Sequence, residues 1–429
     1  MTGLKKYVRD PRLPAQVGDD ALCVPSEREV RELINNHLRI ENAPEVAALT
    51  LDYARWKPGR SITCTFGVEL TDGQNEIVVL KRYLDGKAGH VARHFDPGPH
   101  LTELESSLRP FAVIEDQGLC LFRFPADRVL RGAARVLNTR RLARRIDGSG
   151  CFSPFVVRLR PSTATLLRFK PERRAVFRFT AKLRGPDDAR DIQTLGVRVL
   201  PPDLAQVVAA RRSTLAQTTG LCPRLIDLDA ESGVLIEEWL PGAVNAEDDF
   251  GTAHDAGASL GAFHLGAASP AEPRADKNLD GLATLFRVDT LLTTLWERVR
   301  LSPPEPATHL IHGDFHPDQL IHTPGSLPAL LDLDAIEPGH PAEDLGSWIA
   351  DHLTADPEVS FATAAEPLLR GYASQLPPPA IRAIYDTTHR QLVERAGAGI
   401  RRLEQGAISR ARRLLEAALH LQSGTGGGA

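Results

Sequence analysis

Alternating apolar and polar residues mark the first part of the chain, and this is the pattern of half-buried β-strands. Two stretches of this kind, residues 54–66 (ARWKPGRSITCTF) and 167–179 (LRFKPERRAVFRF), align at a constant offset. Each continues into a predicted strand, 77–83 or 194–200, then into a helical stretch, and then into a strand and turn that start at Leu119 or Val234. The shared order favours duplication of one β-rich design over chance similarity between amphipathic strands.

Beyond residue 242 the apolar positions recur every three or four residues, which predicts helices. Residues 253–265 form one predicted helix, and 380–421 form a pair of long helices with a break at 396–399. The expected division is an accessory β-rich lobe (1–148), a second β-rich small lobe with a hinge (149–242), a helical large lobe (243–422) and a disordered Gly-rich tail (423–429). The predicted fold class is therefore α+β.

The chemistry is concentrated in residues 309–350, which contain HGDFHPDQ and then LLDLD. Two apolar runs each deliver an acid to a turn, Asp314 after the first and Asp332 after the second. Phosphoryl transfer needs one carboxylate to receive the proton of the attacking hydroxyl, and another to hold Mg²⁺ together with a neutral oxygen. Gln319, five residues after Asp314, carries a suitable amide oxygen.

These motifs, together with the later GHPAEDLG, resemble those of the aminoglycoside phosphotransferase and choline kinase superfamily over about residues 150–421. The resemblance implies a bilobal protein-kinase-like fold, here preceded by an additional small-lobe-like domain, with ATP bound between the lobes. It also implies that Asp314 is the catalytic base, that Gln319 and Asp332 bind Mg²⁺, and that His312 and Asp344 support the catalytic loop. Gln319 stands where most members of the superfamily have Asn.

Two alternatives remain open within this segment. Asp334 competes with Asp332 as the metal ligand, although alternating strand residues cannot put both on one face without curvature. His316 is interpreted as a loop-packing or substrate-facing residue rather than a metal ligand.

A kinase-like small lobe normally pairs a strand Lys with a helix Glu. In the second lobe Arg198 stands about where that Lys is expected, and the following helix, 202–218, offers only Asp203 and Gln206. Arg198 is either a phosphate-neutralising cation or a surface residue on an edge strand. In the first lobe, Lys81 lies on a predicted strand, and Glu103 and Glu105 lie on a predicted helix that follows it in the sequence.

The segment VLIEEWLPG resembles the hinge of the same superfamily, so the backbone near Glu238, Trp239 and Leu240 is expected to bind adenine. A plain core position is the alternative for Trp239. Phosphate contacts are expected from the loop between Pro171 and Ala175, where Arg173 and Arg174 are available.

Composition narrows the class of protein. A formal net charge of −4 does not indicate a nucleic-acid binder, and no apolar run approaches the length of a membrane span. The five scattered cysteines fit a reducing cytoplasm. The leading hypothesis is an ATP- and Mg²⁺-dependent phosphotransferase acting on a hydroxyl of a small molecule, of the aminoglycoside, sugar or amino alcohol type. The alternatives are a nucleotide-binding pseudokinase or scaffold, and a partner-binding module built on the first lobe; the sequence sets no oligomeric state.

Overall fold

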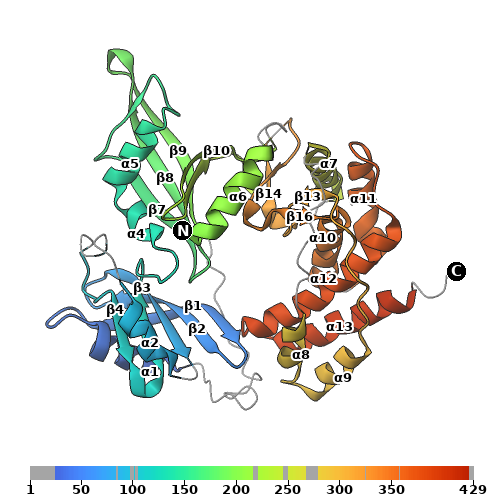
Figure 1. The fold of residues 1–429 in the computed structure, drawn as a ribbon, viewed down its shortest axis with the longest axis horizontal. Coiled ribbons are helices and arrows are strands. Elements are labelled where there is room, and N and C mark those ends of the chain that lie inside the picture. Colours follow the sequence, from blue (N-terminus) through green and yellow to red (C-terminus); the bar gives the residue numbers. More distant parts are fainter. Residues whose placement is uncertain are drawn as a thin grey trace. The chain divides into compact units, whose positions relative to one another are not determined.

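The computed structural model describes residues 25–83, 86–96, 101, 105–215, 221–244, 250–266, 279–323, 325–356 and 358–424. The chain divides into two compact units. Unit 1 comprises Met1–Gln206, Ile226–Glu237 and Gly399–Ile408, and unit 2 comprises Val207–Leu225, Glu238–Ala398 and Ser409–Ala429. The two large β-sheets belong to unit 1 and most of the long helices to unit 2 (Figure 1), which confirms the α+β class.

The first sheet of unit 1 has five antiparallel strands in the order β1-β2-β3-β5-β4. The inner strand β2 is buried at nearly every position, whereas the edge strand β1 has several exposed positions. The strands are β1 (Val46–Lys57), β2 (Ser61–Leu70), β3 (Asn75–Tyr83), β4 (Phe111–Ile114) and β5 (Leu119–Arg123). The helical segments are α1 (Glu27–Leu33), the π-helical η1 (Ile34–Leu38), α2 (Lys87–His94) and the 3₁₀ turn η2 (Glu115–Gln117).

The second sheet repeats this order as β7-β8-β9-β11-β10, with the short strand β6 also paired to β8. Its strands are β6 (Val156–Val157), β7 (Thr163–Lys170), β8 (Arg174–Arg184), β9 (Arg190–Val199), β10 (Leu225–Asp229) and β11 (Val234–Glu238). The 3₁₀ turn η3 (Pro186–Asp188) joins β8 to β9. Helix α6 (Pro202–Leu215) follows β9, as the sequence predicted.

The pairing registers place the two sheets in the same alignment as the sequence repeat. Strands β1 and β2 pair Trp56 with Ile62, and β7 and β8 pair the corresponding Phe169 with Ala175. One position further along, Thr63 pairs with Lys81 and Val176 pairs with Arg198. Lys81 and Arg198 are therefore equivalent positions on the third strands of two sheets with the same strand order.

Helices α4 (Gly132–Leu137) and α5 (Thr139–Gly148) contribute to the core of the second sheet. Leu130, Val136 and Ile146 share one buried cluster with Phe177 and Val197. The residues just before 149 therefore pack with the sheet that follows them. The domain boundaries drawn from the sequence stay a prediction.

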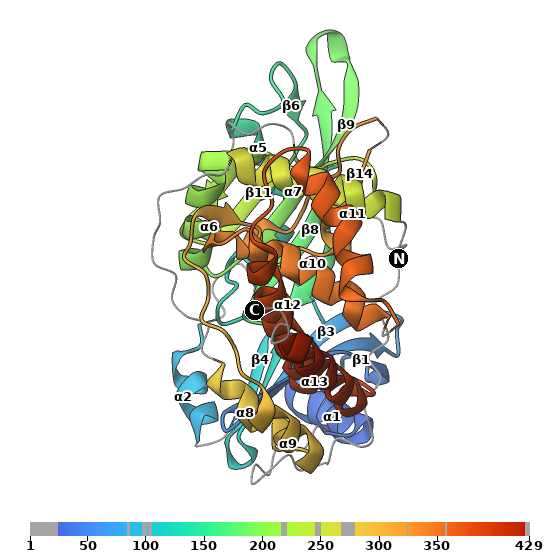
Figure 2. The same cartoon turned by 90° about the vertical axis from the view of Figure 1, so that its right-hand side faces the viewer.

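Unit 2 is built mainly of helices, and α7, α10 and α11 pack together (Figure 2). Helices α7 and α11 approach closely because Gly257 and Gly371 lie against the backbone of the opposite helix, where a Cβ would collide. The helices are α7 (Phe250–Gly266), α8 (Asp280–Phe286), α9 (Thr290–Arg298), α10 (Ala342–Ala355), α11 (Phe361–Ala373), α12 (Ile381–Arg401) and α13 (Ala407–Gly424). No helix in these described residues is both long and apolar enough to span a bilayer.

The break predicted at 396–399 is wrong, because α12 continues through these residues to Arg401. Gly397 instead gives room for a close contact with the side chain of Leu282 on α8. The chain turns later, where Leu403 and Gly406 adopt positive φ.

Short strands in unit 2 frame the segment that carries the predicted chemistry. Strands β13 (His309–Ile311) and β16 (Glu337–Gly339) form one antiparallel pair, and β12 (Ala243–Val244), β14 (Leu320–His322) and β15 (Ala329–Leu330) form a three-stranded sheet. The 3₁₀ turns η4 (Pro317–Gln319) and η5 (Leu333–Ala335) connect these strands. The predicted catalytic loop lies between β13 and η4.

Candidate active site

Asp314 is exposed on a loop whose neighbouring residues are fixed. Gly313 before it has φ 79° and lies so close to the carbonyl oxygen of Ala335 that a Cβ would collide. Phe315 after it is fully buried, and its ring stacks on that of Trp348 at 5.2 Å between centroids. The loop therefore presents the Asp314 carboxylate outward from a rigid backbone.

The loop is anchored by the fully buried carboxylate of Asp344 on α10. One oxygen, Oδ2, accepts the backbone N–H of His312 at 2.7 Å and lies 3.0 Å from Nε2 of His264, while Oδ1 accepts the N–H of Gly313 at 2.8 Å. Burial by itself raises the pKa of Asp344, but the contacts with His264 and His312 outweigh it and hold the pKa below its ordinary value of 3.8. Asp344 is thus an ionised acceptor that orders the residues before Asp314.

His264 is held from its other side by Tyr372 on α11. Nδ1 of His264 lies 3.0 Å from the Tyr372 hydroxyl. Burial raises the pKa of Tyr372, so its hydroxyl stays protonated and can donate to Nδ1. Nε2 of His264 then carries the proton that is donated to Asp344.

Gln319 and Asp332 lie beside each other because β14 and β15 pair in register. Leu320 pairs with Leu330, and the N–H of Leu331 donates to the carbonyl of Gln319 at 2.7 Å. The side-chain amide of Gln319 lies 3.5 Å from Oδ2 of Asp332 and 3.0 Å from Nε2 of His316. His316 therefore contacts a predicted metal ligand.

The catalytic loop and the Asp332 loop are joined directly. Nε2 of His312 donates to the carbonyl of Leu331 at 2.7 Å, immediately before Asp332. Asp332 itself has φ 57°, a left-handed conformation that is unusual for a residue other than glycine. Asp334 lies two residues further on in η5, so the geometry brings Asp332 rather than Asp334 to Gln319.

The donor set of this pair fits a hard cation. Asp332 supplies a carboxylate, and Gln319 supplies an amide oxygen. The amide nitrogen of Gln319 faces Asp332, and a half-turn of the amide group brings its oxygen to the same position. No group of three or more His, Cys, Asp or Glu suited to a metal occurs in the part of the chain that the structure describes. Two protein oxygens are nevertheless sufficient for Mg²⁺, which retains several waters and binds substrate phosphates.

Arg198 is not a surface residue on an edge strand. Strand β9 lies inside the second sheet, and Arg198 is only 7% exposed. Its guanidinium lies 3.7 Å from the carboxylate of Glu237 on the neighbouring strand β11. The carboxylate beside Arg198 therefore comes from a strand, whereas the sequence offered only Asp203 and Gln206 of the following helix as candidates.

The expected hinge starts where the chain passes from unit 1 to unit 2, between Glu237 and Glu238. The N–H of Glu238 already donates to the carbonyl of Arg224 at 2.9 Å, so this group is not available to adenine. Trp239 is 39% exposed, so the alternative of a plain core position is wrong. Leu240 is half-buried. Adenine recognition by this segment stays a prediction that depends on its remaining backbone groups.

Lys81 has a carboxylate partner, but not the one expected. Its Nζ lies 2.6 Å from Oε2 of Glu172, a residue of the second sheet. Glu105 is exposed and not helical, and Glu103 lies outside the described residues. Sequence proximity suggested an acid of the same lobe, whereas packing supplied one from the next.

Several residues that shape the site were not predicted. His264 and Tyr372 hold Asp344, and Arg211 on α6 donates to the carbonyl of Ile336 at 2.6 Å, at the end of the loop that contains Asp332. A histidine among small and apolar residues of a helix is a signal that could have indicated His264, because a buried imidazole requires polar partners.

Comparison with known proteins gives one family match. The model of the phosphotransferase enzyme family matches residues 138–385, which is more than half of the chain. Comparison with the curated proteins gave no match.

Solved structures similar to this chain include macrolide 2′-phosphotransferase MphH of Brachybacterium faecium, with 18% identity, a TM-score of 0.41, and coverage of 63% of this chain and 97% of that one. Choline kinase of Cryptosporidium parvum has 12% identity, a TM-score of 0.42, and coverage of 61% and 89%. An ethanolamine kinase of Plasmodium vivax has 12% identity, a TM-score of 0.41, and coverage of 61% and 84%.

Proposed function

Because the chain belongs to the phosphotransferase enzyme family, we propose that it transfers the γ-phosphoryl group of ATP, with Mg²⁺, to a hydroxyl group of a small molecule. Family membership confirms the resemblance seen in the sequence and the expected class, a kinase-type phosphotransferase of protein-kinase-like fold. The nucleotide, the metal and the acceptor class are part of the proposal.

The observation that carries the proposal is the exposed carboxylate of Asp314 on a loop fixed by Asp344 and Phe315. A carboxylate in this position receives the proton of the attacking hydroxyl and orients its oxygen. Because the flanking backbone is already ordered, little conformational freedom remains to be lost when the acceptor binds.

Gln319 and Asp332 are the residues proposed to hold Mg²⁺, and their 3.5 Å contact supports this. When bound there, Mg²⁺ would neutralise negative charge on the phosphates of the nucleotide. His312 holds the carbonyl of Leu331, so the loops of Asp314 and Asp332 keep a fixed mutual spacing.

Arg198 is proposed to neutralise the phosphates, and Glu237 holds its guanidinium in place. This Arg–Glu pair on adjacent strands supplies a positioned cation, although the helix after β9 contains no Glu. The pair thereby removes the main reason to interpret the chain as a catalytically impaired scaffold. The segment of Glu238, Trp239 and Leu240 remains the proposed adenine site. For the acceptor we propose an aminoglycoside, a sugar or an amino alcohol.

The test is transfer of radiolabelled γ-phosphate from ATP to a panel of these acceptors, with Asp314→Asn compared with wild type. We expect kcat to fall by about 10²–10⁴-fold, the usual contribution of a general base, with little change in KM for ATP. Asp318→Asn is the matched control, since Asp318 is an exposed acid four residues later, in η4. Undiminished turnover by Asp314→Asn would show that another group takes the proton.

A further inference from the structure

The two β-sheets contain the same tight turn with one difference. Lys57-Pro58-Gly59-Arg60 closes through a 3.0 Å hydrogen bond from the N–H of Arg60 to the carbonyl of Lys57, and Gly59 has φ 64°. The aligned turn closes in the same way from Arg173 to Lys170, but Glu172 stands in place of the glycine, with φ 58°. Glycine adopts this left-handed conformation without strain, whereas a residue with a Cβ does not.

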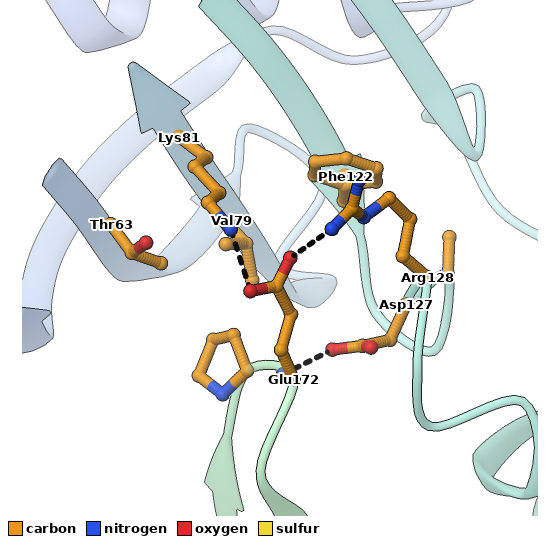
Figure 3. A pocket seen from close by; sticks show the side chains of 9 residues that line it. Thr63, Val79, Lys81, Phe122, Asp127, Arg128 and Glu172 are labelled. Atoms are coloured by element: carbon orange, nitrogen blue, oxygen red, sulfur yellow. Dashed lines mark hydrogen bonds and ion pairs between the residues drawn. The ribbon is translucent and has the colours of Figure 1, made fainter. Parts of the chain in front are cut away.

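Glu172 is held in this unfavourable conformation by three residues of the first lobe (Figure 3). Lys81 on β3 lies 2.6 Å from Oε2, and Arg128, which follows β5, lies 3.4 Å from Oε1. The carboxylate of Asp127 accepts the backbone N–H of Glu172 at 2.8 Å. We call Lys81, Asp127, Arg128 and Glu172 the Glu172 clasp.

The clasp is mostly shielded from water. The side chains of Lys81 and Glu172 are 5% and 20% exposed. Burial by itself raises the pKa of Glu172, but the charge of Lys81 and its hydrogen bond, with Arg128, hold the pKa below its ordinary value. Glu172 is therefore ionised at neutral pH, and the contact is a charged one.

The surroundings of the turn that contains Glu172 suit an anionic ligand. Burial, with the nearby charges of Lys81 and Arg55, lowers the pKa of Lys57. Burial also lowers the pKa of Arg55, and the charge of Arg173 adds to this effect. Arg173 is exposed, next to Glu172 in the chain, and its N–H closes the turn. Whatever fixes Glu172 therefore also fixes the backbone from which the exposed side chain of Arg173 extends.

We propose that the Glu172 clasp positions the 170–174 turn for contact with the nucleotide phosphates, so that the first lobe acts as a support for nucleotide binding. Lys81 occupies the position equivalent to Arg198. In this proposal it binds Glu172 in the turn of the second sheet and does not contact a phosphate itself. This inference rests on the proposed function. It assigns positioning roles, not catalytic ones, to Lys81 and Glu172.

The experiment compares KM for ATP, KM for the acceptor and kcat in Lys81→Met, Glu172→Gln and Glu172→Gly. Glu172→Gly recreates the Gly59 turn and removes the backbone strain, which offsets part of any stability lost with the charge pair. Glu29→Gln is the control, because it breaks the 3.3 Å ion pair with Arg82 at the neighbouring position of β3 without touching the clasp.

We expect KM for ATP to rise about tenfold in all three variants, with kcat and KM for the acceptor changed less than about twofold. The double variant Lys81→Met with Glu172→Gln should be no worse than either single one, because each already breaks the same contact. Amide hydrogen exchange in residues 170–174, measured without nucleotide, should accelerate in Lys81→Met and stay unchanged in Glu29→Gln.

Two outcomes separate the inference from the proposed function. If wild type transfers phosphate and both Lys81→Met and Glu172→Gly keep the wild-type KM for ATP, the clasp does not position the turn, and the inference is overturned while the function stands. If wild type transfers no phosphate from ATP to any acceptor, the proposed function is overturned, and the inference with it.

Discussion

Replacement of Asp344 by Asn should destabilise unit 2 and slow catalysis together. The carboxylate accepts two backbone N–H groups and lies within hydrogen-bond distance of His264, entirely out of contact with water. Asn has one acceptor oxygen in place of two, so its NH₂ group must face at least one of the N–H donors of His312 and Gly313. That donor is then buried without a partner.

The magnitude follows from these contacts. A hydrogen bond to a charged group contributes about 1.5–3 kcal/mol, and a buried donor without a partner costs about 1–3 kcal/mol. We therefore expect the free energy of unfolding to fall by about 3 kcal/mol, a large part of the 5–15 kcal/mol typical of a domain. Since the affected N–H groups precede Asp314, we also expect kcat to fall by about 10²-fold through misplacement of its carboxylate.

The effect should depend on pH in a defined direction. The pKa of Asp344 is lowered in the folded state, so its contribution to stability is present above its ordinary pKa of 3.8 and is lost as the pH falls through the folded value. The difference in stability between wild type and Asp344→Asn should therefore be full at neutral pH and shrink in acid.

Urea denaturation at neutral pH and at a series of acidic pH values, combined with steady-state kinetics, measures these effects. Asp351→Asn is the matched control, because Asp351 lies on the same helix and forms a partly exposed ion pair with Arg395, a type that contributes at most about 1 kcal/mol. If the free energy of unfolding of Asp344→Asn is within about 0.5 kcal/mol of the wild-type value and its kcat is unchanged, the anchoring role assigned to Asp344 is wrong.

Two further predictions concern buried contacts. Arg198→Met removes the cation beside the buried carboxylate of Glu237 and should lower the free energy of unfolding by about 3–5 kcal/mol, with a smaller loss for Arg198→Lys. Equal stability of wild type and both variants in urea would contradict this. Gly397→Val should force the new side chain against Leu282 and lower the free energy of unfolding by about 1–3 kcal/mol, which is measured as a lower Tm. An unchanged or raised Tm would show that the contact between α12 and α8 can accommodate a larger side chain.

Features encoded by neighbouring residues could be predicted from the sequence. The repeat was visible because both lobes keep a Lys-Pro turn between two alternating strands, and the registers of the two sheets bear this out. The loop that contains Asp314 was also visible, since its His-Gly-Asp motif follows an apolar run directly.

Partners brought together by packing could not be predicted in this way. Glu172 meets Lys81 across 91 positions, and His264 meets Asp344 across 80, so no local pattern links either pair. Gly397 was misinterpreted for a related reason. A glycine-rich stretch within a helix marks a break or a close helix contact equally well, and only the neighbouring helix decides which.

The central claim is that Asp314 and Asp332 have separate tasks, proton transfer and metal binding. Calorimetric titration of ATP into wild type, Asp314→Asn and Asp332→Asn, each with and without Mg²⁺, tests it most directly. We predict that Mg²⁺ strengthens ATP binding to wild type and to Asp314→Asn, and does not do so for Asp332→Asn. The same gain from Mg²⁺ in all three proteins would contradict the assignment of Asp332 as the metal ligand.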